Sequence, residues 1–254
     1  MSSKPSPGWP PLTRHPLQRI ESPSRTASIL LHSTGLAAFA YAFRYLIINP
    51  NRINDSYGWH FQYLTIIGLA LATTTFTLGL LSDLLLSRSL FAAKNALALA
   101  STPLAILVSL LYWGLRAIDE RLVLPDWAPL IDPFADMCFH AFPALLLFVD
   151  CMLFSPPWDV GGAGVAALTG AFTIGYWVWV DRCYAENGFY PYPIFDEVGH
   201  RGRVGLFGMS ALVMGLSTVG LRWMYRVLNG EESEMAWKKN VHELGEGMPQ
   251  RKKK

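Results

Sequence analysis

Long apolar runs alternate with short polar connections along most of the chain. Each run is close to the ~20 residues that cross the hydrocarbon of a bilayer as a helix. The runs cover residues 27–48, 61–86, 97–115, 137–154, 161–180 and 204–226. They are continuous and do not alternate as barrel strands do, and lipid offers no hydrogen-bond partner to an open sheet edge. The pattern therefore predicts an all-α polytopic membrane protein, a bundle of about six transmembrane helices.

Polar segments flank the expected membrane domain, residues 27–226. Residues 1–26 are rich in Pro, Ser and Arg and lack an apolar stretch with a cleavage site, which predicts a disordered tail without a removable signal peptide. Residues 227–254 form a basic tail. Lys and Arg gather on the side of the termini, which would also hold Arg88 and Lys94, so both termini are expected in the cytoplasm.

The last four residues, RKKK, loosely resemble a dilysine retrieval signal. We expect the endoplasmic reticulum or another endomembrane as the location. A solvated charge run or a contact with anionic lipid is the favoured interpretation of this segment, and a retrieval signal is the alternative.

The composition favours lipid surroundings and narrows the class of function. Hydrophobic residues make up 52% of the chain and charged residues 16%, against roughly 25% charged in soluble domains. The net charge is +2 and no basic stripe is interleaved with aromatic residues, so no nucleic-acid partner is predicted. Cys138, Cys151 and Cys183 lie in or beside apolar runs, as buried thiols do. The histidines form no paired iron-binding motif and no glycine-rich phosphate loop occurs, so neither metal nor cofactor is expected.

Polar residues inside apolar spans mark candidate sites, because burying them in lipid is costly. His140 lies about one turn inside the fourth run, and Asp136, four residues earlier on the same helical face, can orient its imidazole. Thr65 lies at a similar depth, since the second and fourth runs both start on the outer side. A hydroxyl and an imidazole at one depth are the minimum parts of a nucleophile and a general base. A structural histidine and a hydroxyl bonded to its own helix are the alternatives.

Aromatic residues gather on the same side of the predicted bundle. Tyr112 ends the third run, and the proline-rich loop from Tyr184 to Phe195 contains Tyr190 and Tyr192. This loop either caps a pocket or lies in the membrane interface.

Three segments resemble one known family. They are SYGWHFQYLT at 56–65, DMCFHAFPALLLFVD around His140 and GYWVWVDRCYAENGFYPYPIFDEVG at 175–199. Together they resemble the androgen-induced protein and androgen-dependent TFPI-regulating protein family, in a fungal version. The resemblance implies a multi-pass membrane hydrolase that cleaves fatty acid esters of hydroxy fatty acids. The family's threonine nucleophile matches Thr65, and its histidine matches His140.

If the resemblance holds, the expected reaction is acyl transfer to Thr65 with His140 as general base, followed by hydrolysis. Asp136, Tyr112, Tyr190 and Tyr192 are then candidates for orienting or pocket residues, and the lipid ester is expected to arrive from the bilayer.

Two other interpretations remain open at the level of sequence. One is a non-enzymatic membrane protein, either a scaffold or a small transporter with a proton path through Asp83, Asp150 and His140. Asp83 and Asp150 fall toward the cytoplasmic half of the predicted bundle, where helix pairing and a water-filled cavity are both possible. The other is metal-dependent hydrolysis with His60, His140 and nearby acids as ligands.

Overall fold

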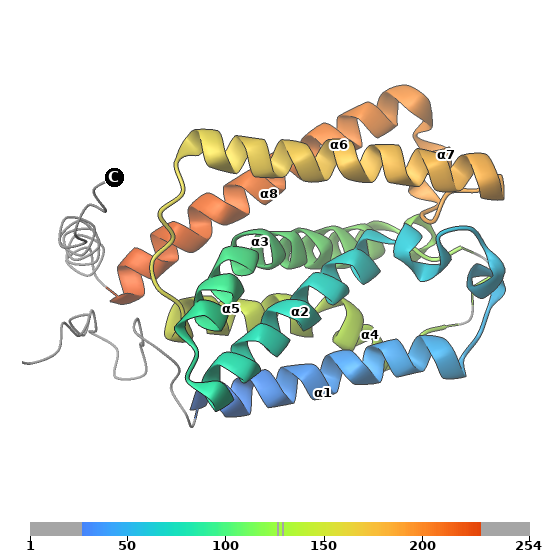
Figure 1. The fold of residues 1–254 in the computed structure, drawn as a ribbon. Coiled ribbons are helices and arrows are strands. Elements are labelled where there is room, and N and C mark those ends of the chain that lie inside the picture. The colour runs from blue at the N-terminus through green and yellow to red at the C-terminus, as the bar shows by residue number, and fades with distance from the viewer. Residues whose placement is uncertain (1–26, 126, 129, 230–254) are drawn as a thin grey trace, which may run out of the picture.

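The computed structural model describes residues 27–125, 127–128 and 130–229, so the predicted tail 1–26 and residues 230–254 lie outside it. The described chain is a bundle of helices without a strand (Figure 1). The long helices are α1 (Ala27–Ile48), α2 (Leu64–Leu85), α3 (Arg88–Ile118), α6 (Gly162–Asn187) and α8 (Gly199–Asn229). The short ones are α4 (Pro133–His140), α5 (Phe142–Phe154), α7 (Ile194–Glu197) and the 3-10 turns η1 (Arg52–Asp55), η2 (Trp59–Gln62) and η3 (Glu120–Leu122). The predicted all-α polytopic class is confirmed.

The number of spans differs somewhat from the expected six. Among the described residues, α2, α3, α6 and α8 are long and apolar enough to cross a membrane, and α4 with α5 forms a fifth candidate. The first predicted span, α1, has 22 residues, or about 33 Å of helix, but is not one of these candidates. The reason is composition: α1 carries His32, Arg44 and several hydroxyl residues.

Helix boundaries shift where polar residues are buried. The third run was expected to begin at residue 97, but α3 begins at Arg88, and the Ser87 hydroxyl caps it by accepting a hydrogen bond from Leu90 N at 3.4 Å. Lys94 is therefore not a basic residue on the membrane flank. It lies inside α3 and is completely buried. At the other end α8 continues to Asn229, three residues into the predicted tail.

The predicted fourth span is broken at Ala141. The two pieces, α4 and α5, meet at an angle of 43°. Pro143 follows the break, and a proline lacks the N–H needed for the helix ladder and clashes with the preceding turn. His140 is thus the last residue of α4 and is not inside a continuous helix.

The central helix of the bundle is α3, which packs against α2, α5 and α8. On one side α1 lies along α2 and α5, and on the other α6 packs on α8 (Figure 1). The start of α1 and the end of α8 lie at the same end of the bundle, as a shared side for the termini requires. The cytoplasmic placement of that side stays a prediction.

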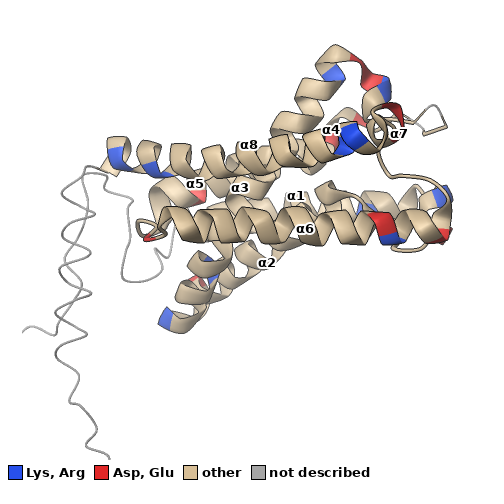
Figure 2. Ribbon diagram, turned by 90° about the horizontal axis from the view of Figure 1, so that it is seen from above, with Lys and Arg blue, Asp and Glu red and all other residues tan. Residues whose placement is uncertain are grey.

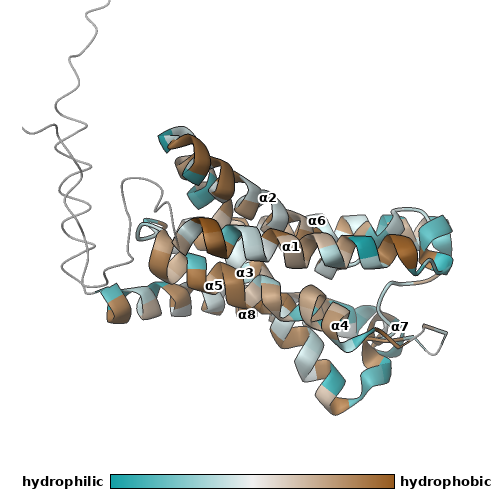
Figure 3. Cartoon of the chain, turned by 90° about the horizontal axis from the view of Figure 1, so that it is seen from below, coloured by the Kyte–Doolittle hydropathy of each residue, from teal (hydrophilic) through white to brown (hydrophobic). Residues whose placement is uncertain are grey.

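The surface of the bundle suits a bilayer. Lys, Arg, Asp and Glu lie mainly near helix ends and in connections (Figure 2), and apolar residues dominate the middle of the helices (Figure 3). Exposed large apolar side chains follow α8, with Leu212, Leu216 and Val219 all more than half exposed. Such a surface belongs in lipid, so the chain is an integral multi-pass membrane protein.

Candidate functional site

Thr65 is the second residue of α2 and differs from the other threonines of that helix. The hydroxyls of Thr73, Thr74, Thr75 and Thr77 each donate to a carbonyl one turn earlier at 2.7–2.9 Å. Thr65 has no helical turn before it, and its Oγ1 lies 3.4 Å from the Tyr192 hydroxyl instead. The hydroxyl of Thr65 is therefore not absorbed by its own helix.

The start of α2 also leaves backbone N–H groups available. Ile66 N and Ile67 N donate to the carbonyl of Tyr63 at 3.1 and 3.2 Å. Thr65 N is one of the first-turn donors that lack a carbonyl within the helix, and it lies 3.4 Å from the Tyr192 hydroxyl. Two donors, the backbone N–H of Thr65 and the hydroxyl of Tyr192, thus lie directly beside the Thr65 hydroxyl.

His140 is oriented by the carboxylate expected to do so. Its Nδ1 lies 2.7 Å from Asp136 Oδ1, one turn back on α4. Because a carboxylate only accepts, Nδ1 carries the hydrogen and Nε2 keeps its lone pair in the neutral ring. Both residues are buried, at 7% and 4% exposure.

A residue that the sequence analysis missed completes this chain of contacts. Arg116, on α3, forms an ion pair with the second oxygen of Asp136 and donates to the Tyr112 hydroxyl at 2.9 Å. The Tyr112 ring lies flat against the His140 imidazole, with centroids 3.4 Å apart and planes 4° from parallel. The only available sequence signal was the four-residue spacing of Tyr112 and Arg116. The imidazole is therefore held at Nδ1 by the Asp136 carboxylate of α4 and on its face by the Tyr112 ring of α3.

One cavity contains both predicted catalytic residues. We call it the loop cavity, because residues from 49–63 and from 123–125, 127–128 and 131 form much of its wall. It holds about 880 Å³ of empty space, including its open side, and both Thr65 and His140 line it. Within the described residues no hydrogen bond joins the two side chains. They share a space in which a reacting group can lie between them.

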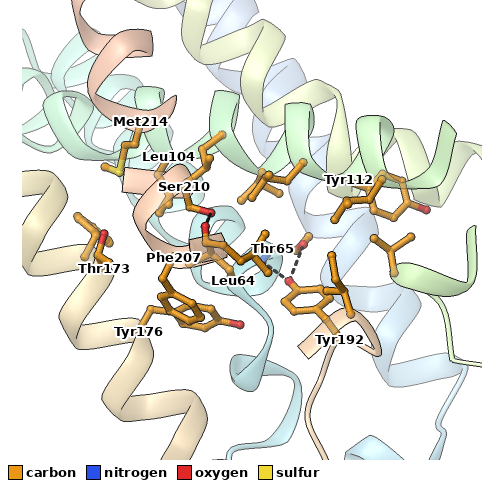
Figure 4. A pocket seen from close by; sticks show the side chains of 18 of the residues that line it. Leu64, Thr65, Leu104, Tyr112, Thr173, Tyr176, Tyr192, Phe207, Ser210 and Met214 are labelled. Atoms are coloured by element: carbon orange, nitrogen blue, oxygen red, sulfur yellow. Dashed lines mark hydrogen bonds between the residues drawn. The ribbon is translucent and has the colours of Figure 1, made fainter. Parts of the chain in front are cut away.

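A second cavity begins at the same threonine (Figure 4). This inner cavity, enclosed by α2, α3, α6, α7 and α8, holds about 810 Å³ of empty space and shares Thr65, Tyr112, Val123 and Tyr192 with the loop cavity. Among the described residues, no charged side chain lines it. Ser210, Thr173 and Tyr176 donate their hydroxyl hydrogens to backbone carbonyls at 2.8–3.0 Å. Away from Thr65 the inner cavity is therefore an apolar slot, with Met214 among its lining residues (Figure 4).

The two candidate tyrosines of the proline-rich loop have different places. Tyr192 lines both cavities, and burial raises the pKa of its hydroxyl, which therefore stays protonated and able to donate. Tyr190 lines neither cavity. Its hydroxyl donates to Asp181 at 3.3 Å, and Arg203 lies over its ring at 4.4 Å. The loop thus covers the inner cavity through Tyr192, Ile194 and Phe195.

Asp83 and Asp150, at the other end of the bundle, are joined to residues of neighbouring helices. His32 Nδ1 lies 2.8 Å from Asp83, and its Nε2 lies 3.1 Å from Asp150. Lys94 Nζ lies 2.7 Å from the second oxygen of Asp150. All four are at most 2% exposed. Of the two earlier possibilities for these aspartates, the structure has helix pairing.

His60 lines the loop cavity without a charged partner among the described residues. Its Nε2 lies 3.2 Å from Asn54 Oδ1, and burial lowers the pKa of the ring to about 4. Within the described residues, no group of three or more His, Cys, Asp or Glu side chains is arranged to hold a metal ion.

Comparison with known proteins identifies relatives over the same region. The family model described as FAR-17a/AIG1-like protein matches residues 27–226. A UPF0641 membrane protein of Schizosaccharomyces pombe is 35% identical over 175 residues, 68% of this chain and 78% of its own length. The human androgen-induced gene 1 protein is 23% identical over 180 residues, 63% of this chain and 74% of its own length. No solved structure matches the chain. The family model covers the helical bundle except for residues 227–229 at the end of α8, and the chain therefore belongs to the FAR-17a/AIG1-like family.

Proposed function

We propose that this protein is a membrane-embedded lipid-ester hydrolase with Thr65 as nucleophile and His140 as general base. One observation carries the proposal: Thr65 and an Asp136-oriented His140 line one cavity, and an apolar slot continues from Thr65. Together these are a reactive hydroxyl, a base and space for hydrocarbon, as lipid-ester hydrolysis requires.

The proposed first step forms an acyl-threonine. His140 Nε2 takes the Thr65 hydroxyl proton, directly or through one water, while Oγ1 bonds to the ester carbonyl carbon. The bond from that carbon to the alcohol oxygen then breaks, and the alcohol leaves with the proton from His140. In the second step His140 takes a proton from water, whose oxygen attacks the acyl carbon, and returns it to Thr65.

The negative charge on the tetrahedral intermediate needs donors close to Thr65. The backbone N–H of Thr65 and the Tyr192 hydroxyl fit this role, because both lie beside Oγ1 and the contact between them is long, at 3.4 Å. The positive end of α2 adds to the effect.

The proposed substrates are fatty acid esters of hydroxy fatty acids or similar lipid esters. They match an apolar slot and a second cavity that meet at the reacting hydroxyl. We propose the endoplasmic reticulum or another endomembrane as the location, where such lipids reach the protein through the bilayer.

The test is ester hydrolysis by purified protein in detergent, with a fluorogenic medium-chain ester and a branched fatty-acid ester. Thr65→Ala and His140→Ala are each expected to lower kcat at least a hundredfold, and Thr65→Ser is expected to retain part of it. Thr77→Ala is the matched control, since its hydroxyl bonds only to its own helix.

The outcomes separate the proposal from its alternatives. Turnover that survives Thr65→Ala in a folded protein would exclude the threonine as nucleophile. No turnover by folded wild type on either ester would favour a scaffold or transporter.

A further inference from the structure

Arg52 lies between Asn51 and Ile53, which line the loop cavity, and it has no carboxylate partner among the described residues. Its guanidinium lies 4.1 Å from the centre of the Trp127 ring and 4.6 Å from that of Phe189. Trp127 lines the cavity and Arg52 itself is exposed. Two other exposed guanidiniums near this end are paired with carboxylates: Arg121 with Asp119 at 2.8 Å and Arg182 with Glu186 at 2.5 Å.

The position of Arg52 is fixed by its surroundings. It is the first residue of η1, whose cap is reciprocal: the Asn51 side chain accepts from Ile53 N at 2.9 Å, and Asn51 N donates to Asn54 Oδ1 at 2.8 Å. The two aromatic rings come from separate segments and hold the guanidinium by cation–π attraction. A fixed guanidinium can bind an anion with little loss of side-chain entropy, since its planar donors are preorganised.

The two cavities differ in the polarity of their lining, and this difference favours one orientation of a bound substrate. In the part of the chain that the structure describes, no charged residue lines the inner cavity, and the hydroxyls far from Thr65 are bonded to backbone carbonyls. The loop cavity is lined by polar groups including Asn49, Asn51 and His60, and it reaches the segment that carries Arg52. A charged end of a lipid would lose its hydration in the inner cavity and would keep polar contacts in the loop cavity.

We propose that Arg52 binds the anionic end of the substrate's alcohol arm, with that arm in the loop cavity, the ester at Thr65 and the plain acyl chain in the inner cavity. This inference rests on the proposed hydrolase function and adds a specificity-determining residue to it. It predicts that an ester with a free carboxylate on the alcohol arm is preferred over its neutral counterpart.

The experiment uses two esters that share both chains and differ only at the far end of the alcohol arm, a free carboxylate in one and its methyl ester in the other. The full-length protein in detergent is expected to show a kcat/KM ratio of about ten or more in favour of the carboxylate, as one charged hydrogen bond provides. Arg52→Gln is expected to bring the ratio close to one, and Arg52→Lys to retain part of it. Arg182→Gln is the matched control, because it removes an exposed guanidinium that already has Glu186 as partner.

A phospholipid headgroup offers the same anionic chemistry at Arg52. In that case Arg52→Gln would change the rates of both esters equally and leave their ratio unchanged, which overturns the inference while the hydrolase function stands. A preference that survives Arg52→Gln overturns it as well.

A binding measurement keeps the inference testable if wild type hydrolyses neither ester, a result that would count against the hydrolase function itself. Oleate and methyl oleate are titrated against wild type and Arg52→Gln in an uncharged detergent. An Arg52-dependent Kd for oleate alone supports the anion site. Equal Kd values for oleate in both proteins overturn it.

Discussion

At the scale of single residues, Asp136 has the most consequential contacts. One of its oxygens fixes the hydrogen on His140 Nδ1, and the other pairs with Arg116. Asp136→Asn keeps the size of the side chain but not its acceptor-only character, so the amide can donate to Nδ1 and move the ring hydrogen to Nε2. That tautomer cannot take a proton from Thr65. We expect kcat to fall about a hundredfold or more, with a smaller change in KM.

Circular dichroism and gel filtration of Asp136→Asn establish that the fold is retained, and Asp119→Asn serves as the control. Asp119 is a partly exposed aspartate that is also paired with an arginine, Arg121 at 2.8 Å, but it is not among the residues that line either cavity. A kcat for Asp136→Asn equal to that of Asp119→Asn would remove Asp136 from the mechanism.

The sequence predicted part of this site for a physical reason. The pair Asp136 and His140 is local, one turn apart on a helix, and the matching depth of Thr65 follows from the order of apolar runs. Arg116 and Arg52 were not predicted. The carboxylate partner of Arg116 is 20 residues away, and the two rings beside Arg52 are in other segments, so no local pattern encodes these contacts.

At the scale of helices, the contact of α1 with α2 depends on a glycine. A Cβ on Gly79 would lie 2.4 Å from His32 Nε2, far inside van der Waals contact. His32 cannot move aside easily, because carboxylates hold both its ring nitrogens. Gly79→Ala is therefore expected to destabilise the protein by about 1–3 kcal/mol.

The matched control is Gly68→Ala on the same helix. There a Cβ would meet Val108 at 3.8 Å and Leu104 at 3.9 Å, which is ordinary packing. This variant is expected to be neutral or slightly stabilising, because alanine favours a helix over glycine. Thermal unfolding in detergent, followed by circular dichroism, compares the two. Equal unfolding temperatures would mean that α1 does not pack against α2 as described.

The helices themselves were easier to predict than their ends. The long apolar runs predicted the spans, but a buried charge interrupts an apolar run. The expected third span therefore omitted the first nine residues of α3, which include Lys94. Likewise a continuous apolar pattern conceals the break at Ala141, which depends on the missing N–H of Pro143.

At the scale of the whole molecule, one buried network connects four helices. His32 of α1, Asp83 of α2, Lys94 of α3 and Asp150 of α5 are linked by contacts of 2.7–3.1 Å. With both carboxylates ionised, both nitrogens of His32 donate, and the two positive and two negative charges sum to zero. Such a network does little for stability compared with apolar packing, but it penalises any arrangement that separates its members.

The charge balance of this network gives a prediction that tests whether Lys94 and Asp150 are coupled as an ion pair or only pack against each other. Lys94→Met leaves one uncompensated negative charge in the bundle and is expected to cost about 3–5 kcal/mol, seen as a lower unfolding temperature in detergent. The double variant Lys94→Met/Asp150→Leu restores neutrality, since His32 and Asp83 remain as a pair. It should therefore be more stable than Lys94→Met alone, although it carries one more substitution in the core. Arg88→Met, at the exposed start of the same helix, controls for the loss of a cation. The comparison also needs the single variant Asp150→Leu. If the loss of stability in the double variant equals the sum of the losses in Lys94→Met and Asp150→Leu, the two residues are not coupled, and the bundle is held in place by its apolar contacts alone.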